Sequence, residues 1–366
     1  MIPYCRPDRY TLAILGLIGM MLVLHFAIVD IPRAYVFDEF YYVPQALAFL
    51  SGSRIPLWHP PLGLLLIAFG IAVFGDRGLG WRFSSVVFGV LSIGVLYLLV
   101  NACTRDKRVA LFSSTLYAFD SLIFVQSSIA MLDIFFVCFM LVGFLLYWRN
   151  NRMLASIMMA LSTLCKLIGV MGFGVLVVMM LIEHEEPRAL LKRAAVYVLS
   201  VALVFWGFLL VQGLLVDPFS TLIEMAWKNV FSGPVEGWTL SSQPWDWLVN
   251  QKPIPYYVAK ASDVYEIRYR GLGNSMIWLL TVPAIIGVAY DYLRHGKKPS
   301  LFVLVWFVMV YLVPWYPIAL LSPRSLYLFY FLPAVGAVTT SISIGVASIS
   351  ELLGERLSKT IMSIYL

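Results

Sequence analysis

The chain has 366 residues, of which 61% are hydrophobic and only 13% are charged, and its mean hydropathy is +0.86. A soluble domain is roughly half apolar, so this composition excludes a soluble protein and indicates an integral membrane protein. The net charge of +6 includes no basic run interleaved with aromatic residues, which argues against nucleic-acid binding.

Apolar stretches recur along nearly the whole chain, and a helix needs about 20 such residues to cross a bilayer. Helices are expected because hydrocarbon cannot satisfy an open sheet edge. The first stretch follows Arg6 and Arg9 and lacks a small-residue cleavage site, so we expect a retained span and not a signal peptide. The predicted fold is all-α and polytopic, with about ten spans. These lie near residues 10–29, 80–101, 109–125, 133–148, 153–166, 168–183, 194–214, 274–290, 300–318 and 326–349.

Two places depart from simple spans. Pro60 and Pro61 open an apolar segment that ends near residue 75, which is too short to cross and is expected to lie in the membrane interface. The fifth and sixth spans are short and are separated only by the surroundings of Lys166. They are either one broken pair of helices or two tilted segments.

Basic residues crowd into alternate short connections, which indicates that these connections are cytoplasmic. The two termini are then inside, and two long segments, 30–79 and 215–273, are outside. We divide the chain into a catalytic transmembrane half (1–214), a second outer loop (215–273) and C-terminal transmembrane helices (274–366). The basic stretches read "CTRDKR", "WRNNR", "RALLKR", "LRHGKK" and "GERLSK".

The cysteines and histidines do not form a recognisable site. There are four of each, they are scattered over both sides of the predicted membrane, and no Cys-x-x-Cys occurs. We therefore predict no disulfide framework and no metal-ligand set. No cofactor is required by this pattern, although it does not exclude a divalent cation.

Charged residues collect on the predicted outer face. A charge at bilayer depth costs roughly 2.5 to 3.5 kcal/mol on insertion scales and usually faces a partner or a cavity. Each residue also has an ordinary structural alternative, namely helix capping for Asp133, snorkelling for the cations, a solvated loop for the acidic pair and a turn for His59. The charged residues are Asp38, Glu39, Arg82, Asp133, Lys166 and Arg324.

An acidic pair beside several cations fits transfer of a group from a lipid-linked phosphate. Arginine offers a planar fork and lysine a point charge to a phosphate. A carboxylate can take the proton of an incoming hydroxyl. Phosphate leaves readily once its charge is compensated, so this chemistry needs neither a separate acid nor a metal.

The order of eight short motifs resembles the protein O-mannosyltransferases of the glycosyltransferase-C superfamily, from about residue 36 to residue 335. The resemblance implies a polytopic helical fold with an outer-face cavity, a dolichyl- or polyprenyl-phosphate sugar donor, and inverting transfer to a serine or threonine hydroxyl of an acceptor protein. Membrane lipids are the other expected partners. The motifs are "FDEFYY" with "HPPLG", "GWRFSSVVFGVLS", "QSSIAMLDI", "LSTLCKLIGVMGF", "SSQPWDWLV", "LGNSMIWLL" and "SLYLFYFLPA".

The resemblance also implies residue roles. Asp38 would be the catalytic base and Glu39 its acidic companion at the acceptor site. Arg82 and Lys166 would bind the donor phosphate, together with Arg324, whose spacing is less diagnostic. The residues expected to support the substrate site are His59, Asp133, Gln243, Trp245, Trp247 and Tyr330. Of these, Gln243, Trp245 and Trp247 lie in the loop that helps to close the site.

This sequence departs from the family pattern at three positions. Leu64 stands where the family has lysine, Ser128 where it has arginine, and Tyr330 where it has histidine. The second outer segment is too short for the sugar-binding MIR module of eukaryotic members. We therefore expect a compact prokaryotic relative, of archaeal origin, in the cell membrane with its site facing outside. A eukaryotic member would lie in the endoplasmic reticulum membrane.

Two alternatives stay open. A glycosyltransferase-C enzyme with a lipid or glycan acceptor, as in the transferases that modify lipid A with aminoarabinose, shares much of this pattern, but "SQPWDW" favours the protein-acceptor branch. A transporter of an anion or lipid phosphate would explain the cations. It is less favoured because no pair of matched, Gly/Pro-broken spans indicates inverted repeats.

Overall fold

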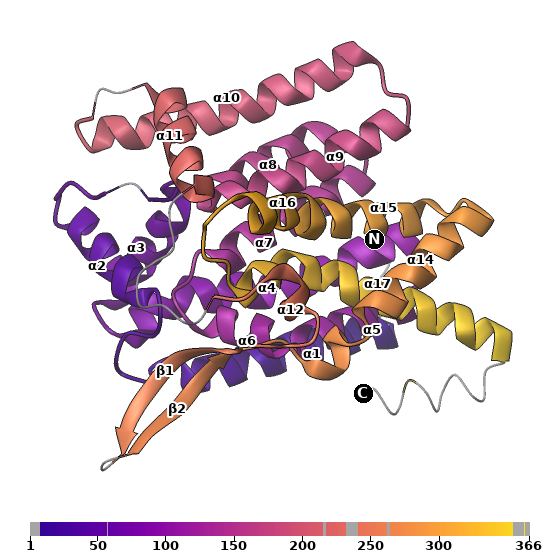
Figure 1. Ribbon diagram of the computed structural model, residues 1–366, viewed down its shortest axis with the longest axis horizontal. Coiled ribbons are helices and arrows are strands. Elements are labelled where there is room, and N and C mark those ends of the chain that lie inside the picture. Colours follow the sequence, from indigo (N-terminus) through magenta and orange to yellow (C-terminus); the bar gives the residue numbers. More distant parts are fainter. Residues whose placement is uncertain are drawn as a thin grey trace, which may run out of the picture.

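The structure is a computed structural model that describes residues 8–56, 58–214, 217–231, 241–261, 264–353 and 362. It is almost entirely helical, with one small sheet (Figure 1). The helices are α1 (Arg9–Ile28), α2 (Glu39–Leu50), α3 (Leu62–Phe74), α4 (Gly78–Thr104), α5 (Lys107–Ala118), α6 (Ser121–Ser128), α7 (Asp133–Trp148), α8 (Arg152–Cys165), α9 (Val170–Ile182), α10 (Pro187–Val211), α11 (Pro218–Phe231), α12 (Pro244–Trp247), α13 (Ser275–Trp278), α14 (Thr281–His295), α15 (Lys298–Phe307), α16 (Val313–Leu321) and α17 (Leu332–Leu353).

Helices occupy all ten predicted positions, but fewer of them are full-length spans. Within the described residues, six helical segments are long and apolar enough to cross a membrane, and a seventh is added if α5 and α6, bent by 63°, count as one span. Helices α7, α8 and α9 are shorter. The count of about ten spans stays a prediction, since an apolar helix buried inside the protein has the same composition as one that faces lipid. This chain is a multi-pass integral membrane protein.

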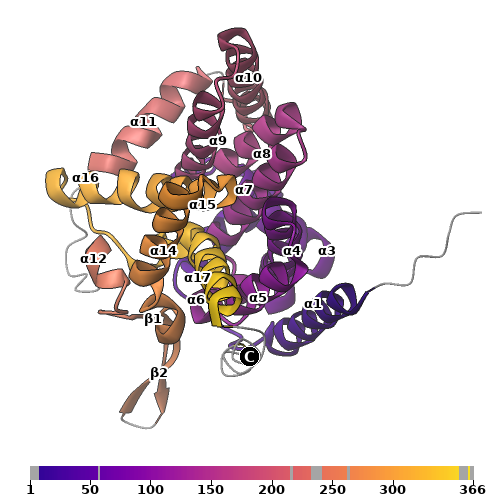
Figure 2. The ribbon, with the colours of Figure 1, turned by 90° about the vertical axis from the view of Figure 1, so that its right-hand side faces the viewer.

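The centre of the molecule is built on α4 and α7. Helix α7 packs against α4 and α8, and most of its side chains are buried. Helix α4 also approaches α6 closely, since a Cβ at Gly89 would lie 2.2 Å from Ser127 Oγ, so this contact requires glycine. Helix α1 lies at one edge against α4 and α5 (Figure 2). Long apolar side chains on both faces of α7 thus become core.

The predicted short helix between residues 60 and 75 is confirmed as α3. It packs mainly against α4 and α2. Gly70 allows the close approach to α4, because a Cβ there would lie 2.4 Å from the carbonyl oxygen of Gly80. Phe69 and Val73 on its other face are exposed. The interfacial position of this helix stays a prediction.

The second long connection contains a hairpin that the sequence analysis did not predict. Strands β1 (Ile254–Ala261) and β2 (Val264–Gly271) pair antiparallel, and the register shifts around Tyr256 and Tyr257. The bulge leaves Tyr256 pointing into the body of the protein, where it is buried. The hairpin, α2, α3 and α11 all lie at one end of the molecule (Figure 1).

The connections predicted to be cytoplasmic join α4 to α5, α7 to α8, α9 to α10 and α14 to α15. Partly exposed ion pairs join three of these connections, with Glu183 accepting from Arg152 and from Lys298. The last basic stretch, near residues 354–359, lies outside the described residues.

Candidate functional site

Asp38 is the last residue of the connection between α1 and α2. Phe37 has a left-handed backbone (φ 50°), and its N–H donates to the carbonyl of Tyr256 in the hairpin. The Asp38 side chain does not cap α2, and it has no hydrogen bond within the described part of the chain. Burial raises the pKa of Asp38 to about 7; the charge of Lys166 opposes this rise and that of Asp133 adds to it.

Glu39, the next residue, is in the opposite situation. Its carboxylate forms a fully buried pair with Arg82, with Nε to Oε1 and Nη2 to Oε2 both at 2.8 Å. The two oxygens also accept from the backbone N–H groups of Ala130 (2.7 Å) and Val36 (2.8 Å). Glu39 is therefore completely bound by the protein.

Arg82 is bound just as completely. Its remaining donors, at Nη1 and Nη2, reach the carbonyl oxygens of Val29, Pro32 and Ala34 at 2.9 to 3.0 Å. A guanidinium has five N–H donors, and five hydrogen bonds use them here. The expected roles of Arg82 as a phosphate ligand and of Glu39 as an acceptor-site carboxylate stay untested predictions, and in this structure both side chains are fully hydrogen-bonded by the protein. Together they fasten the α1–α2 connection to α4 and to the segment before α7.

Lys166 and Asp133 form a second buried pair. Asp133 is the first residue of α7, and Lys166 follows α8 in an extended conformation. The lysine Nζ lies 2.9 Å from both carboxylate oxygens, and it stands over the rings of Phe329 (5.1 Å) and Tyr330 (5.5 Å). This pair retains one unused ammonium proton, so it can still bind an anion.

Arg324 lies in the connection before α17 and is partly exposed. Its Nη2 donates to the hydroxyl of Tyr330 at 3.0 Å. Tyr330 in turn stacks on Trp315, with centroids 4.4 Å apart, and meets the edge of Trp247. Aromatic packing thus fixes one side of Arg324 and leaves most of its donors without a hydrogen bond among the described residues.

His59 lies at the cavity formed by the α2–α3 connection, next to Tyr42. Its Nδ1 is buried and has no partner in the described residues. Burial, together with the positive charges of Lys166 and Arg324, lowers the pKa of His59 to about 3. The ring is therefore neutral at physiological pH and serves as a hydrogen-bonding group, not as a cation.

Two tyrosines at the site were not identified from the sequence. Burial raises the pKa of Tyr42 and of Tyr256 well above the usual value, and the charges of Asp38 and Asp133 add to both shifts, which places the two hydroxyls beside these carboxylates. Tyr42 could have been found, because it follows Asp38 by one helical turn. Tyr256 comes from the unpredicted hairpin and accepts from Gln126 Nε2 (2.8 Å).

The residues of "SQPWDW" differ in burial and in their contacts with the site. Trp247 is fully buried, donates to Ser242 Oγ (2.9 Å) and packs on the aromatic group below Tyr330. Gln243 begins α12, and its N–H donates to Asp246. Trp245 is exposed and packs on Tyr316. Trp247 thus supports the site from behind, whereas Trp245 contacts none of the charged site residues described above.

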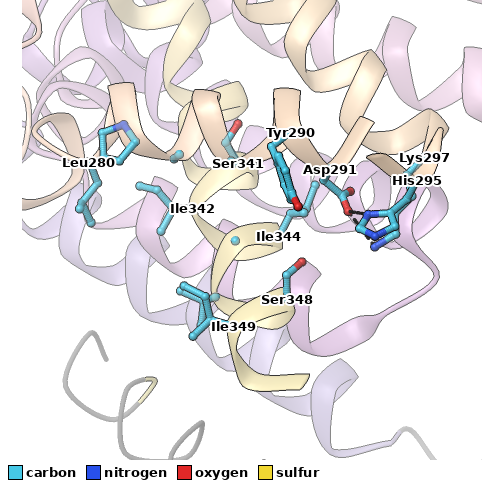
Figure 3. Close-up of a pocket in the computed structure, with 15 residues that line it drawn as sticks. Leu280, Tyr290, Asp291, His295, Lys297, Ser341, Ile342, Ile344, Ser348 and Ile349 are labelled. Carbon is cyan, nitrogen blue, oxygen red and sulfur yellow. Dashed lines mark hydrogen bonds and ion pairs between the residues drawn. The ribbon is translucent and has the colours of Figure 1, made fainter. Parts of the chain in front are cut away.

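The site is separate from an apolar cavity elsewhere in the described residues. A cavity of about 690 Å³ lies between α14 and α17, with apolar walls and with Asp291, His295 and Lys297 at one end (Figure 3). None of the expected site residues lines it. Among the described residues, no three His, Cys, Asp or Glu side chains converge as ligands for a metal ion.

Comparison with known proteins shows a partial similarity to one family. The family model described as dolichyl-phosphate-mannose-protein mannosyltransferase matches residues 58–211. A polyprenol-phosphate-mannose–protein mannosyltransferase of Mycolicibacterium smegmatis is 36% identical over 116 residues, which cover 30% of this chain and 22% of that relative. The chain is similar to this mannosyltransferase family over part of its length. Its match spans less than a quarter of that relative, which is bacterial, so the expected archaeal origin finds no support there.

Two solved structures share the fold of this chain. The Saccharomyces cerevisiae protein O-mannosyltransferase Pmt1–Pmt2 complex bound to the sugar donor superposes with a TM-score of 0.76 at 12% identity, covering 98% of this chain and 88% of that one. ArnT from Cupriavidus metallidurans bound to undecaprenyl phosphate gives 0.65 at 20% identity, covering 92% and 60%. The chain therefore has the glycosyltransferase-C fold predicted from its motifs.

Proposed function

We propose that this protein is an inverting glycosyltransferase that moves a sugar, mannose, from a polyprenyl-phosphate donor to a serine or threonine hydroxyl of a protein. The observation that carries the proposal is Asp38, a carboxylate with no side-chain hydrogen bond in the described protein, beside the cation Lys166. The charge of Arg324 acts together with that of Lys166 on His59. Similarity to the dolichyl-phosphate-mannose-protein mannosyltransferases supports the donor class. The sugar and the acceptor are inferred from the activity named for the related mannosyltransferases.

Asp38 accepts the acceptor proton in this proposal. The hydroxyl oxygen attacks the anomeric carbon, the bond from that carbon to the phosphate oxygen breaks, and the proton passes to Asp38. Attack from the face opposite the phosphate inverts the configuration. The pKa of about 7 suits a general base near neutral pH, because a base is most effective when its pKa lies near the working pH.

Arg324 and Lys166 hold the leaving phosphate. Among the described residues the Arg324 side chain forms a single hydrogen bond, to Tyr330, which leaves N–H donors in a fork that matches phosphate oxygens. Lys166 shares its charge between Asp133 and the phosphate. His59 and Tyr42 lie beside them as neutral hydrogen-bonding groups. Arg82 is absent from this set because Glu39 and three carbonyls occupy all its donors.

The proposed site faces the side of the membrane opposite the basic connections, which is the outside of the cell by the positive-inside rule. It draws on the first long connection, on the helix ends at Asp133 and Lys166, and on the C-terminal helices at Arg324. The proposed site therefore uses residues from all three segments of the chain, 1–214, 215–273 and 274–366. Tyr256 is the residue that comes from the second segment.

A direct assay tests the proposal. The purified protein is incubated with radiolabelled polyprenyl-phosphate mannose and with either a Ser/Thr-containing peptide or a lipid extract. We expect label in the peptide and none in the lipid. Label in the lipid alone would replace the protein acceptor by a lipid acceptor, and no transfer to either, with an active related enzyme as positive control, would contradict the proposed function.

A further inference from the structure

Helix α11 carries an exposed apolar stripe that the proposed chemistry does not use. Phe219, Ile223, Trp227 and Phe231 follow one another at intervals of four residues and are 46%, 68%, 65% and 47% exposed. Residues at this spacing lie along one side of a helix. Large apolar side chains in such a row are costly in water, so the row indicates contact with an apolar phase or partner.

The rest of α11 has two other faces. Met225 is buried and Leu222 packs against the protein core, so one face is held by the protein. Glu224 and Lys228 form an exposed ion pair on another face. The helix therefore has a protein face, an apolar exposed face and a charged exposed face. A helix at a membrane interface has this arrangement, with its charged face in water and its apolar face in lipid.

The position of α11 agrees with an interface. Helix α10 is long and apolar enough to span, and its last turns expose Leu203, Leu210 and Val211, as expected for a surface in contact with lipid. Helix α11 begins seven residues after α10 ends. It runs along the outside of the molecule (Figure 2), at the end that carries α2, α3 and the hairpin (Figure 1). It therefore stands where the chain leaves the bilayer.

We propose that α11 is a membrane-interface helix whose partner is the lipid surface on the side of the candidate site, with Phe219, Ile223, Trp227 and Phe231 inserted at the boundary between headgroups and acyl chains. Trp227 suits this depth because indole combines an apolar ring with a polar N–H. The charged pair Glu224–Lys228 faces water.

The last turn of α11 connects this surface to the site. Asn229 Nδ2 donates to the carbonyl of Trp58 (3.2 Å), the residue before His59. Ser322 Oγ donates to the carbonyl of Val230 and accepts from the N–H of Arg324. The connection that carries the neutral His59 and the connection that carries the cationic Arg324 are therefore both hydrogen-bonded to α11. This half of the inference rests on the proposed function: α11 aligns the site with the lipid layer from which a polyprenyl donor enters.

Depth measurements test the membrane contact without any turnover. In full-length protein with Cys5 replaced by serine and reconstituted in nanodiscs, single cysteines at Ile223 and Trp227 are spin-labelled and compared with cysteines at Glu224 and Lys228. We expect oxygen to relax the labels at Ile223 and Trp227. A water-soluble nickel chelate should relax the labels at Glu224 and Lys228. Equal exposure to the nickel chelate at all four positions overturns the proposal. Shielding of Ile223 and Trp227 from both reagents also overturns it, because a protein partner then covers the stripe.

Kinetics test the connection to the site. Trp227→Gln and Lys228→Gln place the same side chain on adjacent faces. We expect Trp227→Gln to raise the KM for a long-chain donor in a bilayer by roughly threefold or more, with little change for a short, water-soluble donor, and Lys228→Gln to change neither. Equal effects of both variants overturn the connection. Failure of the unchanged protein to transfer sugar would count against the proposed function only, because the depth profile requires no activity.

Discussion

The two buried ion pairs of this protein differ in what they leave free. Glu39 and Arg82 are hydrogen-bonded to each other, and their remaining side-chain acceptors and donors are hydrogen-bonded to backbone groups. Lys166 and Asp133 are bound to each other, but Lys166 keeps a proton for a ligand, and Asp38 beside them has no hydrogen bond in the described protein. Charge alone therefore does not mark a binding residue. Unused hydrogen-bonding capacity does.

The largest effect should come from breaking the saturated pair. Arg82→Ala removes the partner of a buried carboxylate, and such losses cost about 3 to 5 kcal/mol. We expect a large fall in thermal stability, measured by loss of a monodisperse gel-filtration peak after heating in detergent. Arg324→Ala is the control, since that arginine is partly exposed. Equal stability of the two variants would contradict the structural role of Arg82.

Asp38→Asn and Glu39→Gln compare the two adjacent carboxylates directly. Asp38→Asn should reduce sugar transfer by about 100-fold or more, the usual contribution of a general base. Its stability should not fall above pH 7, because burial has raised the pKa of Asp38 and its ionised form is the disfavoured one there. Glu39→Gln should mainly lower stability.

The measurement is single-turnover transfer together with thermal melting for both variants. A stable Asp38→Asn protein that transfers sugar at the wild-type rate would remove Asp38 from the mechanism. A Glu39→Gln protein of unchanged stability would show that the buried pair does not hold the α1–α2 connection.

Arg324→Ala should weaken donor binding by roughly tenfold, since a hydrogen bond to a charged group contributes about 1.5 to 3 kcal/mol. Arg324→Lys keeps the charge but loses the fork, so its loss should be smaller. Binding of polyprenyl phosphate, followed by calorimetry, reports this without catalysis. Trp245→Ala is the matched control, because that exposed ring should leave phosphate affinity unchanged. Identical affinities in all three proteins would exclude Arg324 as a phosphate ligand.

Near and above neutral pH, the smallest predicted effect is that of pH itself. Asp38 has a pKa of about 7, so its carboxylate is mostly protonated below that pH and mostly ionised above it. The transfer rate should rise with pH and level off above about 7, falling about tenfold per pH unit well below it. The residual activity of Asp38→Asn should lack this step. A wild-type rate that is constant from pH 5 to 8 would contradict the assignment.

The sequence could predict which elements exist but not how their polar groups are shared. The helices, the short α3 and the outer-end placement of Asp38, Lys166 and Arg324 all follow from hydropathy and motif order. The different surroundings of the Asp38 and Glu39 side chains do not follow from the sequence pattern, because Glu39 is bound by the N–H of Ala130, 91 residues away in the chain. Tyr256 was missed for the same reason, since only the folded hairpin brings it to Gln126.

The Lys166–Asp133 pair has a consequence for the end of the reaction cycle. Both oxygens of Asp133 lie 2.9 Å from the ammonium group, so the pair is already assembled before a donor arrives. An incoming phosphate must compete with that carboxylate, which weakens retention of the spent lipid as well as capture of the fresh one. Asp133 thereby favours product release, and an Asp133→Asn protein should keep polyprenyl phosphate bound for longer after transfer.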